Sequence, residues 1–184
     1  MQGTWTDRRK LVLAIVLSVV SIGVLIFLDQ LTKTHIKHLA EQTSWSGTTV
    51  IPNFFEIKYT VNTGAAWSFL AGVSWAQTFF KILTSVALVG FIVFFVYSFK
   101  KCYKVLTIAL ILIISGTIGN FIDRLIYNGV VDFISLIFGS YHFPIFNLAD
   151  SFMTVGIVMM IIHYLFLDEN KIFSKNESNE DSSN

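Results

Sequence analysis

Two aspartates, Asp132 and Asp150, lie in the most apolar part of a very apolar chain. Ionisable groups are expensive to keep beside a bilayer, so such residues indicate a function by default. The connection between the two flanking apolar runs is short, so one predicted span ends and the next begins at the same membrane face. Asp132, in this connection, can therefore approach Asp150 at the start of the following helix. Two carboxylates that share a proton are the working groups of an aspartic protease.

The chemistry of such a pair follows from the needs of amide hydrolysis. A water molecule must be made nucleophilic and the leaving nitrogen must be protonated, and one ionised and one protonated carboxylate supply both functions. Either aspartate can be the base on this argument. The side chains of Asn120 and Asn147 are candidates to orient the carboxylates by donating hydrogen bonds. The single cysteine and the scattered histidines lack the spacing of metal ligands, so we expect no metal and no other cofactor.

The composition indicates an integral membrane protein. Of the 184 residues, 54% are hydrophobic and only 14% are charged, and the mean hydropathy is +0.66. Soluble domains usually have about 25% charged residues. The length allows one membrane domain, which we place at residues 1–167, followed by a polar tail at 168–184 that we expect to be disordered and cytoplasmic. A net charge of +1 does not indicate a nucleic-acid partner.

Four apolar runs are long enough to span a bilayer. They are Leu11–Leu28, Ile82–Phe99, Val105–Ile122 and a fourth run that begins near Pro144 and ends at Leu167. The first run is retained as a helix rather than assigned to a signal peptide, because no small-residue cleavage site follows it. Basic residues cluster before the first run and after the second, which predicts that both termini are cytoplasmic. The Asp132 connection then lies at the extracytoplasmic face.

The loop between the first two spans, about residues 34–74, is expected to contain a small sheet. Residues 34–49 show no clear period, whereas Phe55–Val61 alternate between apolar and polar residues, which is typical of a half-buried strand. This pattern predicts that Val61 and the other odd-numbered residues of the strand share one face. Asn62 to Gly64 should form a turn, and residues 65–70, with Trp67, should lie at the membrane interface. The connection 125–143 is expected to be an apolar loop.

Two pairs of charged residues are candidates for structural roles. Asp29 and Lys33 are four residues apart, so on a continuing helix they can form an ion pair, although a solvated helix end is an equally good interpretation. Asp123 and Arg124 lie at the end of the third predicted helix, where we expect an ion pair between them.

Five short motifs together resemble those of one known family. They are Asp29-Gln-Leu-Thr-Lys33, Asn62-Thr-Gly-Ala-Ala-Trp67, Gly119-Asn-Phe-Ile-Asp-Arg124, Val130-Val-Asp-Phe133 and Phe146-Asn-Leu-Ala-Asp150. Each motif is weak alone, but all five in this order are specific. The chain resembles the bacterial lipoprotein signal peptidases, also called signal peptidase II, from Asp29 to about Thr154.

The resemblance implies an intramembrane aspartic endopeptidase that removes signal peptides from prolipoproteins. Such an enzyme cuts before a cysteine that carries a diacylglyceryl group, and Asp132 and Asp150 match the catalytic residues. The other matching polar motif residues look like supports for the site and the substrate; with the glycine of the second motif they are Asp29, Lys33, Asn62, Gly64, Asn120, Asp123, Arg124 and Asn147. The implied partners are lipid-modified prolipoproteins, membrane lipids and globomycin-type inhibitors, and we expect a monomer in the bacterial cell membrane.

Two other classes of protein are consistent with intramembrane carboxylates. A proton or ion relay would distribute acidic residues through the membrane depth, whereas here the predicted spans are almost free of charge and the carboxylates gather at one face. A scaffold protein would have no need for Asp132 and Asp150 together. The expected fold is therefore an all-α membrane protein, with four transmembrane helices, a small extracytoplasmic β-sheet cradle and an interfacial segment.

Overall fold

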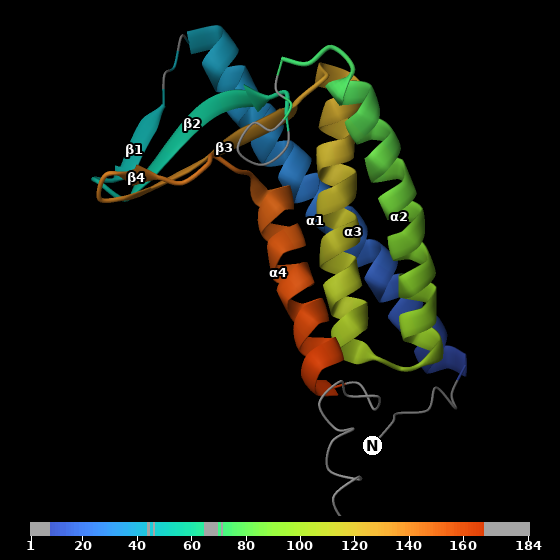
Figure 1. Cartoon of the computed structure of the whole chain (residues 1–184). Helices are drawn as coiled ribbons and strands as arrows, with labels where there is room; N and C mark the ends of the chain where they lie inside the picture. The colour runs from blue at the N-terminus through green and yellow to red at the C-terminus, as the bar shows by residue number, and fades with distance from the viewer. Residues whose placement is uncertain (1–7, 44, 46, 65–69, 71, 168–184) are drawn as a thin grey trace, which may run out of the picture.

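The structure is a computed structural model that describes residues 8–43, 45, 47–64, 70 and 72–167. The described elements are α1 (Arg8–Thr43), β1 (Thr48–Ile51), β2 (Phe55–Asn62), α2 (Ala76–Lys100), α3 (Lys104–Tyr127), β3 (Val130–Phe138), β4 (Tyr141–His142) and α4 (Leu148–Ile162), which continues as a π-helical turn, η2 (His163–Leu167). The helices form a bundle, and the sheet projects sideways from one end of it (Figure 1).

Four helices among the described residues are long and apolar enough to cross a membrane: α1, α2, α3, and α4 together with its π-helical turn. Each contains most or all of one predicted run, so the prediction of four membrane helices with a small sheet is confirmed. The predicted interfacial segment lies mostly outside the described residues, as does the tail at 168–184. Both stay predictions, as does the single-domain boundary at residue 167.

Helix α1 extends far beyond the predicted span and reaches Thr43. The loop was expected to begin at residue 34, but the helix continues to Thr43, so the loop begins ten residues later than predicted. The residues that α1 buries near this end, Asp29, Lys33 and Ile36, follow helical spacing. Two of these three are charged, so a search for apolar periodicity could not detect the buried face. An ion pair between Lys37 and Glu41, 2.8 Å apart, supports the extension on its exposed side.

Helix α3 is the central element of the bundle and packs against each of the other three helices. Over its most apolar stretch 56% of the residues are buried, against 6–11% for the other spans, which therefore lie at the periphery of the bundle. Glycines allow the closest contacts with α4. A Cβ atom at Gly116 would collide with the carbonyl oxygen of Ala149, and one at Gly156 would lie 2.7 Å from that of Ala109. Small residues of this kind let membrane helices approach closely.

The four strands form one antiparallel sheet in the order β1-β2-β3-β4. Strand β2 confirms the predicted strand, but its faces differ from the prediction. The register shifts between Ile57 and Thr60, so a bulge inserts an extra residue and places Thr60 opposite Asp132 and Asn62 opposite Val130. The side chains after the bulge are exchanged between the faces, and Asn62, rather than Val61, lies on the face of Asp132.

Strands β3 and β4 occupy the connection that was predicted to be a loop. Most of β3 is buried, including four consecutive residues from Val130 to Phe133. A strand buried on both faces loses the alternation of apolar and polar residues by which strands are recognised. Periodicity could therefore not distinguish β3 from an apolar loop.

The close contact at Gly116 predicts a loss of stability when a methyl group is added. Gly116→Ala should lower the free energy of unfolding by about 1–3 kcal/mol, because α3 and α4 must move apart. Gly90→Ala on α2 is the matched control, since no atom lies within 4 Å of its Cβ position. Unfolding of both variants in detergent micelles measures the difference. Equal stability of the two variants would contradict this account of the helix contact.

Candidate active site

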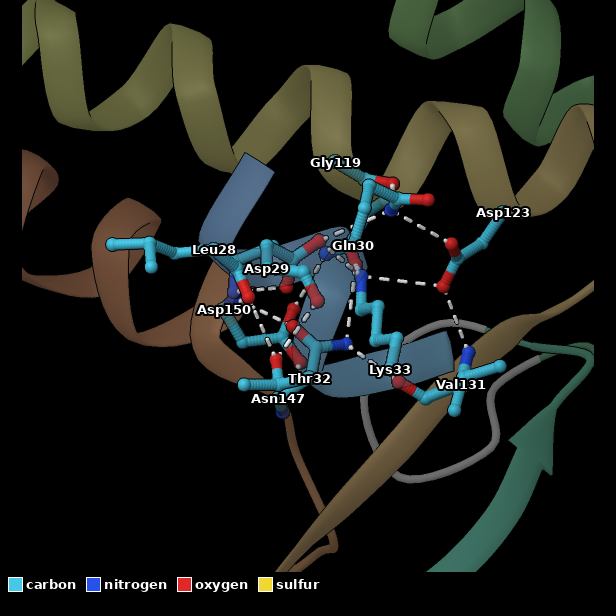
Figure 2. A network of polar contacts seen from close by, with 12 residues as sticks. Leu28, Asp29, Gln30, Thr32, Lys33, Gly119, Asp123, Val131, Asn147 and Asp150 are labelled. Carbon is cyan, nitrogen blue, oxygen red and sulfur yellow. Dashed lines mark hydrogen bonds and ion pairs between the residues drawn. The ribbon is translucent and has the colours of Figure 1, made fainter. Parts of the chain in front are cut away.

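Asn147 brings the two aspartates of the predicted pair together. Its side-chain Nδ2 donates to Asp132 Oδ1 at 2.6 Å, and its backbone N–H donates to Asp150 Oδ2 at 3.2 Å. The Asn147 Oδ1 accepts from the backbone N–H of Asp150 at 2.9 Å, which completes a capping box at the start of α4. The same residue therefore begins the helix and binds both carboxylates; Figure 2 shows Asn147 beside Asp150.

The backbone before α4 pairs with β3, the strand that contains Asp132. Phe146 pairs with β3, where its N–H donates to the Ile134 carbonyl at 3.0 Å and its carbonyl accepts from the N–H groups of Phe133 and Ile134 at 3.0 and 2.7 Å. This short bridge holds the chain against β3 immediately before Asn147. The prediction that Asp132 approaches the start of the fourth helix is confirmed by these contacts.

Asn120 on α3 supports the second carboxylate. Its Nδ2 donates to Asp150 Oδ1 at 2.7 Å, while its Oδ1 accepts from Lys33 Nζ at 2.9 Å and from Asn147 Nδ2 at 3.1 Å. Two donors at the oxygen fix the orientation of the amide. The nitrogen of Asn120 is therefore directed at Asp150.

Asn62 is held in the same manner at the end of β2. Its Oδ1 accepts from the backbone N–H of Gly64 at 2.9 Å, which forms the predicted turn. Its side chain also hydrogen-bonds to Asp132. The bulge in β2 makes this contact possible, and both Asn62 and Gly64 belong to the surroundings of the aspartate pair.

A buried ion network lies directly behind the asparagines. Lys33 Nζ is 2.8 Å from Asp29 Oδ2 and 3.2 Å from Asp123 Oδ2, and the three side chains are between 0% and 2% exposed. The predicted pair of Asp29 and Lys33 is thus confirmed as an ion pair, and a solvated helix end is excluded. Asp29 Oδ1 accepts from the N–H of Ala149 at 2.9 Å, and Asp123 Oδ2 accepts from that of Val131 at 3.0 Å.

The predicted ion pair between Asp123 and Arg124 is wrong. Neighbouring residues on a helix point in different directions, so Asp123 faces α1 and β3 whereas Arg124 does not. The guanidinium of Arg124 lies 5.5 Å from the centre of the Phe80 ring, and its Nη1 donates to the Asn120 carbonyl at 3.4 Å. Its positive charge still acts on Asp132 and on its partner aspartate.

Gln30 belongs to the network although the sequence did not single it out. Its Nε2 donates to Asp123 Oδ1 at 3.0 Å, to the Gly119 carbonyl at 3.1 Å and to Asp29 Oδ2 at 3.3 Å. The adjacent Asp29 was the only available signal, since Gln30 does not share the i, i+4 spacing that identified Lys33. A Cβ atom at Gly119 would lie 2.5 Å from Asp29 Oδ2, so this glycine gives α1 access to the site.

Burial makes the Asp132 carboxyl group a weaker acid than an ordinary aspartate. Loss of solvation, and then the negative charge of Asp150, raise the pKa of the Asp132 carboxyl to about 7. The hydrogen bonds from Asn62 and Asn147 and the charge of Lys33 act in the opposite direction. A carboxyl group that is protonated near neutral pH can act as an acid, which is typical of catalytic sites.

The described residues contain no group of three or more His, Cys, Asp or Glu side chains that could hold a metal ion. A pair of amide-bound aspartates at one end of four membrane helices defines the class of membrane-embedded aspartic peptidases.

Comparison with known proteins identifies the family within this class. The family model described as Signal peptidase (SPase) II matches residues 21–166. A lipoprotein signal peptidase of Listeria welshimeri is 41% identical over 146 residues, covering 79% of this chain and 90% of the relative. One of Bacillus pumilus is 44% identical over 143 residues, covering 77% and 88%. The chain belongs to the signal peptidase II family.

Solved structures agree with this assignment. A bacterial membrane enzyme determined by the in meso method at 2.3 Å resolution has a TM-score of 0.69 and 34% identity, over 90% of this chain and 92% of that one. A second such enzyme, at 1.9 Å resolution, has a TM-score of 0.66 and 37% identity over 82% and 94%.

Proposed function

We propose that this chain is a lipoprotein signal peptidase of the bacterial cell membrane, with Asp132 and Asp150 as its catalytic pair. It cleaves the signal peptide from prolipoproteins before a cysteine that carries a diacylglyceryl group. The observation that carries the proposal is that one residue, Asn147, binds both carboxylates at the end of the bundle. Membership of the signal peptidase II family supports the choice of substrate.

Asp150 is the base of the pair. Its carboxylate accepts hydrogen bonds from Asn120 Nδ2 and from the Asn147 backbone N–H, and it lies in the first turn of α4. These two donors fix the orientation of the Asp150 carboxylate. The ionised Asp150 takes a proton from water as the water oxygen attacks the scissile carbonyl carbon.

Asp132 is the acid. It is 3% exposed, and its pKa is raised to about 7, so a large fraction of the enzyme carries the Asp132 proton at neutral pH. As the carbon–nitrogen bond of the substrate breaks, the Asp132 proton passes to the leaving nitrogen. The products are the free signal peptide and a lipoprotein that begins with the lipidated cysteine.

The remaining polar residues support this pair. Asn62, Asn120 and Asn147 orient the carboxylates, and Gly64 fixes the turn that directs Asn62. The guanidinium of Arg124 adds a positive charge close to the pair. Inhibition by globomycin-type compounds, contact with membrane lipids and a monomeric state stay predictions.

Replacing either catalytic carboxyl group tests the central assignment. Asp132→Asn and Asp150→Asn should each abolish cleavage of a lipidated precursor by the purified protein, because an amide can be neither the acid nor the base. Unfolding in detergent should show that both variants remain folded. Glu56→Gln, a carboxylate-to-amide change elsewhere in the sheet, should cleave normally. Near-normal turnover by either aspartate variant would refute the assignment.

The pH profile tests the division of roles. Activity should fall above pH 7, where Asp132 loses its proton. The hydrogen bond from Asn62 stabilises the ionised form of Asp132 and so lowers its pKa. Asn62→Ala should therefore raise this pKa and move the alkaline limb to higher pH. The charged groups around the pair are Asp29, Lys33, Asp123 and Arg124, and all are unchanged in this variant. An alkaline limb that moves to lower pH would contradict the assignment of Asp132.

We further propose that both termini are cytoplasmic. Arg8, Arg9 and Lys10 at the start of α1, and Lys100 to Lys104 between α2 and α3, lie at the end of the bundle away from the sheet (Figure 1). Basic residues accumulate on the cytoplasmic side. Reporter fusions after Lys104 should report cytoplasm and fusions after Thr43 the outside. The opposite pair of signals would place the site at the wrong face.

A further inference from the structure

Each proposed catalytic aspartate directly follows a residue whose backbone N–H is bound by a buried carboxylate. The N–H of Val131 on β3 donates to Asp123 Oδ2 at 3.0 Å, and that of Ala149 on α4 donates to Asp29 Oδ1 at 2.9 Å. Asp123 comes from α3 and Asp29 from α1, and both side chains are 0% exposed. These two carboxylates therefore hold the two backbone segments that carry the proposed catalytic groups.

Lys33 joins the two carboxylates. Its Nζ lies 2.8 Å from Asp29 Oδ2, 3.2 Å from Asp123 Oδ2 and 2.9 Å from Asn120 Oδ1, as Figure 2 shows for the two aspartates. These three partners match the three N–H donors of an ammonium group. A buried ammonium tolerates little deviation from such geometry, because each lost contact leaves charge without compensation. Lys33 Nζ thus adds an ionic link between the start of β3 and the start of α4, beside the pairing of Phe146 with β3.

We propose that Lys33 is a positioning residue that sets the separation of the two catalytic carboxylates through Asp29 and Asp123. This inference rests on the proposed function. Lys33 itself contacts neither catalytic side chain in the hydrogen bonds of the site; it acts on the backbones before them and on Asn120. A displacement of about 1 Å in a catalytic group can reduce turnover about 100-fold, so the bridge has a direct effect on rate.

A double substitution separates the bridge from its charge. Lys33→Met alone would leave two buried carboxylates without a countercharge and would endanger folding. Lys33→Met combined with Asp29→Asn removes one positive and one negative charge, so the net charge of the network is unchanged. The amide oxygen at position 29 can still accept from Ala149. The ionic link between the two carboxylate positions is lost, together with the hydrogen bond from Lys33 Nζ to Asn120 Oδ1.

The double variant should turn over a lipidated precursor about 100-fold more slowly, with little change in KM. Two effects oppose each other on the alkaline side of its pH profile: the lost Lys33 charge raises the pKa of Asp132, whereas a larger separation from Asp150 lowers it. Asp123→Asn keeps Lys33, so in that variant only the larger separation acts and the alkaline limb should move to lower pH. A purely structural role would reduce the amount of folded enzyme without changing the shape of the pH profile.

Lys37→Met combined with Glu41→Gln is the matched control. It removes an ion pair of the same type and spacing from the same helix, at side chains that are 25% and 55% exposed. The control should keep the turnover, the KM and the pH profile of the unmodified protein.

Normal turnover by the Lys33 double variant would overturn the proposal, and so would slower turnover by Asp123→Asn with an unchanged pH profile. If the double variant does not fold, Asp123→Asn decides, because its amide oxygen can still accept from Val131 while its ionic link to Lys33 is lost. Asp123→Asn should also slow turnover at unchanged KM, and normal turnover would overturn the proposal. The unmodified protein and Asp150→Asn are assayed in parallel. An unmodified protein that does not cleave the precursor refutes the proposed function, whereas cleavage that only Asp150→Asn abolishes refutes the positioning role alone.

Discussion

Burial of charge in an apolar protein is the constraint on which the site depends. A charge taken out of water is costly unless hydrogen bonds and opposite charges compensate it. The buried carboxylates of the site are compensated in two different ways. Lys33 forms ion pairs with the carboxylates of Asp29 and Asp123, whereas the aspartates of the proposed catalytic pair are held by asparagine amides. A direct lysine contact would favour ionisation of both members of the pair, and the proton needed for acid catalysis would be lost. Neutral amides orient the carboxylates and still permit one of them to stay protonated.

The amides can do this only because their own orientation is fixed. Asn62, Asn120 and Asn147 each have a donor at the side-chain oxygen, from a turn, from Lys33 or from the first turn of α4. The nitrogen of each amide is thereby turned toward a catalytic carboxylate. The same contacts therefore stabilise the local structure and orient the aspartate pair. The side chains of Asn62 and Asn147 stabilise the turn after β2 and the start of α4, respectively, and both also bind the pair.

The sequence predicts those parts of the structure in which burial and hydrophobicity coincide. Hydropathy located the four membrane helices, and the short connection before Asp150 was enough to bring the catalytic pair together. The prediction failed where burial and hydrophobicity diverge. The buried stripe at the end of α1 consists of Asp29, Lys33 and Ile36, so its period is not apolar. Strand β3 is buried on both faces and mostly apolar, with Asp132 and Ser135 as its polar residues, so it shows no alternation. The partner of Asp123 was missed because the side chains of neighbouring helical residues point in different directions. Lys33, which lies on another helix, is close to Asp123 only in the folded structure.

The unequal exposure of the two catalytic groups connects this network to hydrolysis in a membrane. Water is a reactant, yet a dry environment is needed to keep one carboxyl group protonated at neutral pH. Asp150 is half-buried, so water can reach the group that we propose as the base. Asp132 is almost completely buried, which raises its pKa and preserves the proton for the leaving nitrogen. A site deep in the bundle would exclude the water, and a site on an exposed loop would lose the proton. The end of a helix bundle, covered by a small sheet, satisfies both requirements.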